Sequence, residues 1–212
     1  MSRVVRVAAD RGVGETVAVE TVPNVVVDLF GLLTYLGDPV TLLLVVATGY
    51  LLADHLDIST TRMAAAIGLA LGGVALTLAL KHAFALPRPP GAGVDGFGFP
   101  SGHAIGATVV YGGVLVVADR YRDPRAVLGV GALVLAVGLS RVVLGVHYLG
   151  DILAGFAVGL VALGVLVVAL ERGATAVFAL AVALSVPAVV VTGGNADATL
   201  ALGGSLGALA GT

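Results

Sequence analysis

The chain has 212 residues, of which 58% are hydrophobic and 11% are charged, and its formal net charge is −2. Globular proteins carry about 25% charged residues, so this composition predicts an integral membrane protein without a soluble domain. The low net charge excludes the basic surface that a nucleic-acid partner would need, and the absence of cysteine excludes disulfides and cysteine metal sites.

Apolar segments recur along most of the chain. Residues 1–22 contain several charges and are expected to form a polar or interfacial arm, followed by a single integral membrane domain over residues 23–212. The fold class that we predict is all-α, a polytopic helical membrane bundle. Its apolar segments are expected at residues 25–36, 40–53, 63–80, 104–118, 126–139, 152–170, 174–191 and 198–210. The first, second and last are short against the ~20 residues that a bilayer usually requires, and 25–36 is either a span or an interfacial helix.

The basic residues divide unevenly between the two ends of these segments. Alternating crossings place Lys81, Arg88 and Arg141 on one side of the membrane. The other side collects five arginines, namely Arg62, Arg120, Arg122, Arg125 and Arg172. Because cytoplasmic loops are enriched in Lys and Arg, the arginine-rich side is predicted to be cytoplasmic. The sequence therefore predicts a multi-pass protein of the cell membrane whose polar site faces the non-cytoplasmic side.

One candidate site begins at Pro100-Ser101-Gly102-His103, directly before an apolar segment. Unpaired N–H groups at a helix start carry the positive end of the helix dipole and bind anions, most commonly phosphate. His103 lies where it could exchange a proton with such an anion. An ordinary helix cap is the alternative interpretation of this motif.

A second group of residues lies on the same side. His147 and Asp151 are four residues apart, which would make them neighbours on one helical face, and a carboxylate there can orient an imidazole. Three cations, Lys81, Arg88 and Arg141, could hold the oxygens of a phosphoryl group. Alternatively, each could be a charged side chain at a helix end that extends to the membrane–water interface. The same cations would repel a divalent metal ion, which argues against a metal site.

Together these residues form three ordered motifs that resemble the type 2 phosphatidic acid phosphatase superfamily, which also includes vanadium-dependent haloperoxidases. The motifs are Lys81-x6-Arg88-Pro89, then Pro100-Ser101-Gly102-His103, then Ser140-Arg141-x5-His147-x3-Asp151. The resemblance implies a six-span core, which the chain would exceed by extra terminal helices.

The resemblance also implies a role for each matched residue. His147 would be the nucleophile that forms a phosphohistidine, Asp151 would orient it, and His103 would be the general acid and base. The phosphate-binding residues would be Lys81, Arg88, Ser101, Gly102 and Arg141. No metal and no other cofactor would be required.

We therefore predict a metal-independent lipid phosphatase at the outer membrane interface, with a polyprenyl diphosphate as the favoured substrate. Phosphatidate or phosphatidylglycerol phosphate would fit almost as well, and residues 91–99 are where selectivity is expected. A phosphotransferase with the same intermediate remains an alternative, and a lipid transporter or flippase is the alternative from another class. A soluble haloperoxidase is disfavoured by the hydropathy. The sequence does not indicate an oligomeric state.

Overall fold

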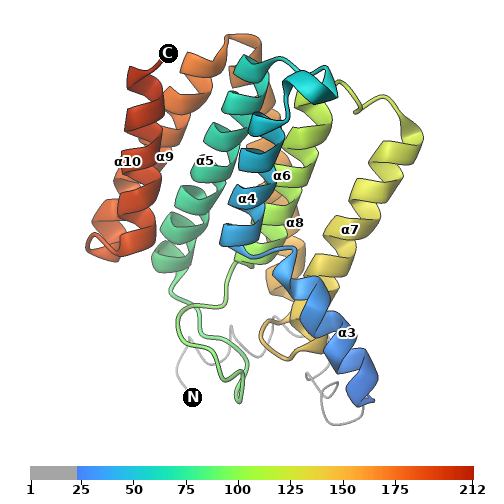
Figure 1. Ribbon diagram of the computed structural model, residues 1–212. Helices are drawn as coiled ribbons and strands as arrows, with labels where there is room; N and C mark the ends of the chain where they lie inside the picture. Colours follow the sequence, from blue (N-terminus) through green and yellow to red (C-terminus); the bar gives the residue numbers. More distant parts are fainter. Residues whose placement is uncertain (1–22) are drawn as a thin grey trace.

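The computed structural model describes residues 23–212, so the predicted arm over residues 1–22 lies outside the described part. The described residues form α-helices, one short 3₁₀ helix and no strand, as predicted for an all-α bundle (Figure 1). The elements in chain order are α3 (Asn24–Tyr35), α4 (Pro39–Leu51), η1 (Asp54–Leu56), α5 (Thr60–Phe84), α6 (Gly102–Val117), α7 (Pro124–Val143), α8 (Leu149–Glu171), α9 (Ala174–Thr192) and α10 (Ala196–Ala210).

Two helices extend further than their apolar segments, and both extensions carry a predicted site residue. Helix α5 continues to Phe84, so Lys81 lies in its last turn, and α7 continues to Val143, so Arg141 lies in its last turn. Long cationic side chains are compatible with helix ends because they can reach polar surroundings while the backbone stays hydrogen-bonded. Helix α5 ends where Ala85 adopts a left-handed conformation (φ 48°), shortly before Pro87.

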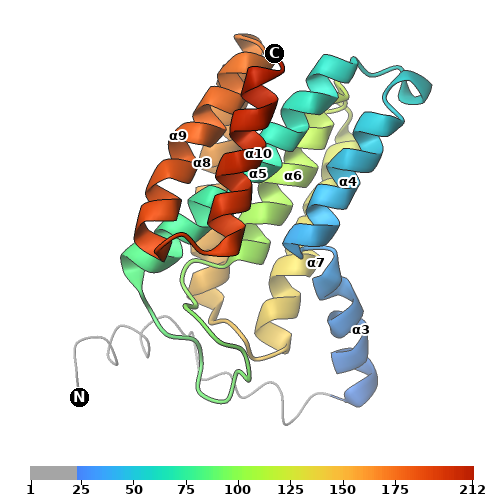
Figure 2. The same ribbon diagram turned by 60° about the vertical axis from the view of Figure 1, so that its left-hand side comes forward.

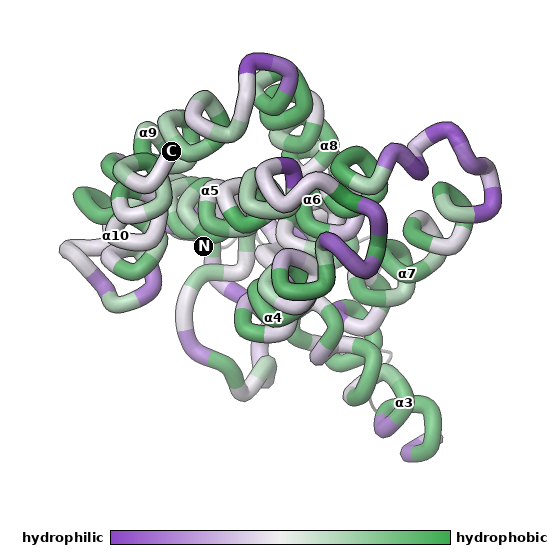
Figure 3. The backbone as a smooth tube through the Cα atoms, turned by 45° about the horizontal axis from the view of Figure 1, so that its top comes forward, coloured by the Kyte–Doolittle hydropathy of each residue, from purple (hydrophilic) through white to green (hydrophobic). Residues whose placement is uncertain are grey.

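Four helices, α5, α7, α8 and α9, are long and apolar enough to cross a membrane. Helices α3 and α4 pass the same test only as a pair, bent by 51° at the break between them, which gives four or five spans by length and composition. Helices α6 and α10 are apolar but shorter. Hydrophilic residues gather at the turns between helices, whereas the helices themselves are largely hydrophobic (Figure 3). The structure thus supports a polytopic membrane bundle, and the six-span core stays a prediction.

Helix α5 lies at the centre of the bundle and packs mainly against α9 and α6, with α4 and α10 on its remaining sides. Helix α6 packs against α8, and α3 packs against α7. Buried residues at these contacts are mostly small or β-branched, including Ala65, Ile105, Val109 and Val177. Small side chains let helix backbones approach closely in lipid, where packing replaces the hydrophobic effect as the main source of helix association.

The helices bring all three predicted motifs to one end of the bundle, the lower end in Figure 1. Helices α5 and α7 end there, and α6 and α8 begin there. The five arginines of the predicted cytoplasmic side belong to the opposite end, where Arg62 pairs with Asp119 and Arg120 lies 2.6 Å from Asp123. The charged residues are thus divided between the two ends as the alternation of helices predicted.

Candidate active site

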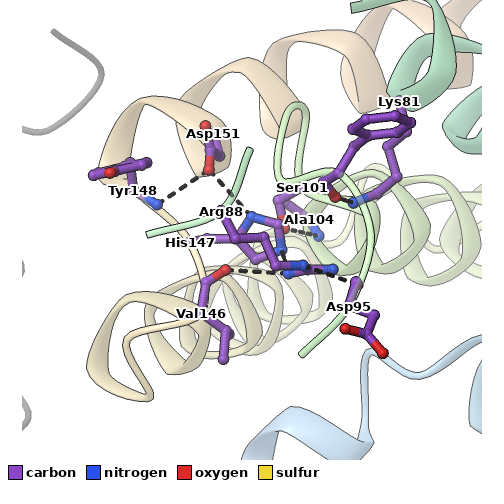
Figure 4. A network of polar contacts seen from close by, with 10 residues as sticks. Lys81, Arg88, Asp95, Ser101, Ala104, Val146, His147, Tyr148 and Asp151 are labelled. Carbon is purple, nitrogen blue, oxygen red and sulfur yellow. Dashed lines mark hydrogen bonds and ion pairs between the residues drawn. The ribbon is translucent and has the colours of Figure 1, made fainter. Parts of the chain in front are cut away.

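His147 and Asp151 form a buried pair at the start of α8. His147 lies in the link between α7 and α8, and Asp151 lies in the first turn of α8. The Nδ1 atom of His147 is 3.2 Å from Oδ2 of Asp151, and the backbone N–H of Tyr148 donates to the same oxygen at 3.1 Å. Figure 4 shows the two side chains beside each other. Both are almost fully buried, with exposed fractions of 2% and 0%. The carboxylate is therefore held in place by the helix start and in turn fixes the imidazole ring.

This arrangement corrects one premise of the sequence analysis. The two residues are neighbours, as expected from their spacing, but they do not share a helical face because α8 begins only at Leu149. The contact instead bridges the N-terminus of the helix, where Asp151 accepts hydrogen bonds from residues that precede it. An acidic residue in a first turn is well suited to this, since the unpaired N–H groups there favour negative charge.

The second ring nitrogen of His147 faces a cation. Nη1 of Arg88 lies 3.1 Å from His147 Nε2 and also donates to the carbonyl oxygen of Val146 at 3.1 Å. A guanidinium can only donate hydrogen bonds, so Nε2 must accept and the proton must reside on Nδ1, facing Asp151. This tautomer leaves the lone pair of Nε2 directed toward the cationic side of the site, which is the arrangement that a nucleophile requires.

The surroundings also keep His147 neutral. Burial lowers the pKa of His147 to about 4, and the nearby charges of Lys81 and Arg88 act in the same direction, against the hydrogen bond to Asp151. A neutral imidazole at physiological pH retains its lone pair, so the electrostatics and the hydrogen bonds agree on the state of the ring.

The loop between α5 and α6 positions two of the three cations. Nζ of Lys81 donates to the carbonyl oxygen of Phe97 at 2.6 Å, and Nε of Arg88 approaches the carbonyl oxygen of Asp95 at 3.4 Å (Figure 4). The aromatic rings of this loop are themselves packed, with Phe97 against His82 and Phe99 against Phe84. The loop in which we expect selectivity therefore also holds the cations in place, and His82 contributes packing to it.

Ser101, Gly102 and His103 open helix α6 beside this pair. Ser101 is the N-cap and is fully buried, and its Oγ is 3.5 Å from the backbone nitrogen of Ala104. The backbone N–H of Ser101 donates to the carbonyl oxygen of Asp151 at 3.0 Å, which joins the helix start to the His147–Asp151 pair. The predicted anion-binding helix start thus lies next to His147.

A cavity of about 490 Å³ connects these groups. Six of the eight predicted site residues line it, namely Lys81, Arg88, Gly102, His103, Arg141 and His147. The other two, Ser101 and Asp151, are fully buried, and the Ser101–Asp151 backbone hydrogen bond connects them. The structure therefore brings the three motifs together around one space.

Two residues of this site were not singled out by the sequence analysis. Oδ1 of Asp38, in the break between α3 and α4, lies 2.9 Å from Nε2 of His103, and Thr34 of α3 accepts a hydrogen bond from Arg141. In the sequence, residues 37–39 appear only as the gap between the apolar segments 25–36 and 40–53. The available signal was an acidic residue in an apolar region, on the same side as the cations.

Comparison with known proteins agrees with this geometry. Residues 61–174, more than half of the chain, match the PAP2 superfamily. The chain belongs to the PAP2 superfamily. This confirms the resemblance carried by the three motifs, all of which lie within the matched region.

One curated relative is a phosphatidylglycerophosphatase B of Bacillus subtilis (strain 168). It is 37% identical over 71 residues, which cover 30% of this chain and 34% of that protein. The chain thus matches only about a third of this relative's length. No solved structure matches the chain significantly.

Proposed function

We propose that this protein is an integral membrane lipid phosphatase that uses Nε2 of His147 as its nucleophile. The observation that carries the proposal is that the two ring nitrogens of His147 have different partners. Nδ1 faces the buried carboxylate of Asp151, while Nε2 accepts from Arg88 at the wall of the cavity. Membership of the PAP2 superfamily supports a phosphatase of this kind.

The proposed reaction has two steps, and residues of the cavity act in both. His147 attacks phosphorus and forms a phosphohistidine, while His103 gives a proton to the leaving oxygen. In the second step His103 takes a proton from the water that hydrolyses the intermediate. The developing charge on the phosphoryl oxygens is stabilised by Lys81, Arg88, Arg141 and the N–H groups at the start of α6, including that of Gly102, with Ser101 capping the helix. Fixed cations can supply this stabilisation, so we propose that the reaction needs no metal ion.

The walls of the cavity favour an amphiphilic substrate. Its polar end carries the cations, and much of the remainder is lined by apolar residues of α4, α5, α6 and α10, among them Leu42, Leu71, Val74, Val110 and Leu200. Helices α4 and α10 flank this region on either side of α5 and α6 (Figure 2). A phosphorylated head group can therefore reach the cations while its apolar chain stays among the helices.

Two substrate types suit this cavity. A polyprenyl diphosphate was favoured from the family and the size of the chain, and phosphatidate or phosphatidylglycerol phosphate was the close alternative. The relative named phosphatidylglycerophosphatase adds support to the phosphatidylglycerol phosphate option. We place the site on the non-cytoplasmic face of the cell membrane, because the arginine-rich turns lie at the other end of the bundle.

The proposal is tested by phosphate release from purified protein in detergent with EDTA present. Phosphatidylglycerol phosphate, phosphatidate and a polyprenyl diphosphate are offered in parallel, and His147→Ala is compared with the wild type. We expect release from at least one lipid, unaffected by EDTA and abolished in the variant. Release that persists in a folded His147→Ala variant would contradict the mechanism. Transfer of phosphate to an added alcohol without net release would favour the phosphotransferase.

A further inference from the structure

Asp38 occupies the N-cap position of α4, but its side chain does not cap the helix. An N-cap aspartate usually accepts a hydrogen bond from a backbone N–H of the first turn. Asp38 makes no such bond, and its Oδ1 lies 2.9 Å from Nε2 of His103. The carboxylate is thus directed away from its ordinary local partner and toward the candidate general acid.

The contact with His103 is close but not aligned as a hydrogen bond. Nε2 of His103 is shielded from solvent and has no hydrogen-bond partner of good geometry among the described residues. A carboxylate at this distance favours the charged form of an imidazole through its field alone. His103 also lines the cavity, so a substrate oxygen bound there would compete with Asp38 for the proton of the ring.

His103 needs such a neighbour to hold a proton. The charged and titratable groups that face it are Lys81 from α5, Arg88 from the α5–α6 loop, Arg141 from α7 and His147 from the α7–α8 link. All of these disfavour a positive charge on His103, as does burial. The acidic residues among the described residues that line the cavity are Asp38 and Asp197, and Asp197 is exposed.

The position of Asp38 is fixed by its surroundings. A Cβ atom added to Gly37 would lie 2.9 Å from Cδ2 of His103 and 2.4 Å from Cγ1 of Val137, so the backbone here packs directly on the histidine ring. The hydroxyl of Tyr111 in α6 donates to the carbonyl oxygen of Leu36 at 2.7 Å. The break between α3 and α4 is thereby attached to the helix that carries His103.

We propose that Asp38 is a positioning residue that orients His103 and offsets part of the positive field around it, which favours the protonated ring that a general acid needs. The inference rests on the proposed function, and Asp38 lies outside the region matched by the PAP2 superfamily. As the bond from His147 Nε2 to phosphorus forms and the bond from phosphorus to the alkyl oxygen breaks, the Nε2 proton of His103 moves to that oxygen. Water then attacks the phosphohistidine and returns a proton to His103, which restores the pair with Asp38.

The test compares two leaving groups in the Asp38→Asn variant. An alkyl alkoxide is a poor leaving group and needs a proton, whereas p-nitrophenolate leaves without one. We expect kcat for phosphatidylglycerol phosphate to fall about 10²-fold and kcat for p-nitrophenyl phosphate to stay nearly unchanged. His103→Ala should show a loss of the same sign on the alkyl substrate. Asp28→Asn is the matched control, because Asp28 is an exposed carboxylate of α3 away from the cavity, and it should change neither rate.

The outcomes separate this inference from the proposed function. Equal losses on both substrates, or no loss on either, would overturn the role of Asp38 while leaving the phosphatase intact. Absence of release from every substrate by the wild type would instead reject the proposed function. A readout without turnover is ¹⁵N NMR of His103, whose protonation midpoint should fall by at least one pH unit in Asp38→Asn. An unchanged midpoint would overturn the inference whatever the activity.

Discussion

The backbone N–H of Ser101 donates a hydrogen bond to the carbonyl oxygen of Asp151, 3.0 Å away. This bond joins two motifs that are fifty residues apart in the sequence and sets the start of α6 against the start of α8. The position of His103 relative to the His147–Asp151 pair therefore depends on how closely these two helices approach.

Gly155 permits that approach, and its substitution should disturb the site from outside. A Cβ at Gly155 would lie 2.8 Å from Cβ of Ala104 and 2.9 Å from the carbonyl oxygen of Ser101. We expect Gly155→Ala to destabilise the protein by about 1–3 kcal/mol and to lower kcat, because overpacking forces the two helix starts apart. Thermal unfolding in detergent and phosphate release measure the two effects. Gly164→Ala in the same helix, where a Cβ meets nothing within 4 Å, is the control and should be neutral.

Asp151→Asn should reduce kcat by about 10²–10⁴-fold with little change in folding. The amide has the size of the carboxylate but no negative charge, so it no longer stabilises the proton on Nδ1 or the positive charge that His147 acquires when it attacks. ¹⁵N chemical shifts of His147 would report the tautomer directly. Wild-type activity in a folded Asp151→Asn variant would exclude the orienting role.

Arg88→Lys should also impair turnover, although the charge is conserved. Nη1 of the guanidinium contacts His147 Nε2 and the carbonyl oxygen of Val146, while its Nε approaches the carbonyl oxygen of Asp95, and the single nitrogen of a lysine cannot occupy both positions. We expect kcat/KM to fall about 10²–10³-fold. Arg122→Lys, at the opposite end of the bundle, provides the comparison, and equal effects of the two substitutions would count against a specific role of Arg88.

The charge state of His147 gives a prediction about pH. Burial and the nearby cations place the pKa of His147 near 4, below the ordinary value of 6.5, so the ring should stay neutral as the pH falls through 6.5 and gain a proton only near pH 4. A ¹⁵N-NMR titration in phosphate-free buffer, with His147→Ala to assign the signal, measures this. A midpoint near 6.5 would contradict the electrostatic description of the site.

Much of the site could be predicted from the sequence because its residues occur in short motifs at helix ends. Local spacing placed His103 at a helix start and His147 near Asp151, and the alternation of apolar segments brought the three motifs to one end. The prediction of a shared helical face for His147 and Asp151 was wrong, because the first turn of α8 begins only after His147.

The contribution of the α3–α4 break could not be predicted in the same way. Asp38 and Thr34 reach the site only because of how α3 and α4 are placed. The two helices are bent by 51° at the break between them, α3 packs against α7, and α4 packs against α6. No local sequence pattern encodes these tertiary contacts. Gly37-Asp38-Pro39 is an ordinary helix-breaking sequence, and the side chain of Asp38 could as well have capped α4. Sequence reasoning located the break correctly but had no means of assigning its neighbours.

The most direct test of the central claim is to trap the phosphorylated enzyme. The His103→Ala variant is mixed with ³²P-labelled p-nitrophenyl phosphate, whose leaving group needs no general acid, and the reaction is quenched with alkali. Because hydrolysis of the intermediate lacks its base, we predict a base-stable, acid-labile label on His147 that is absent when His147 is also replaced by alanine. Phosphate release by the wild type with no label in either protein, or a label on another residue, would contradict the account.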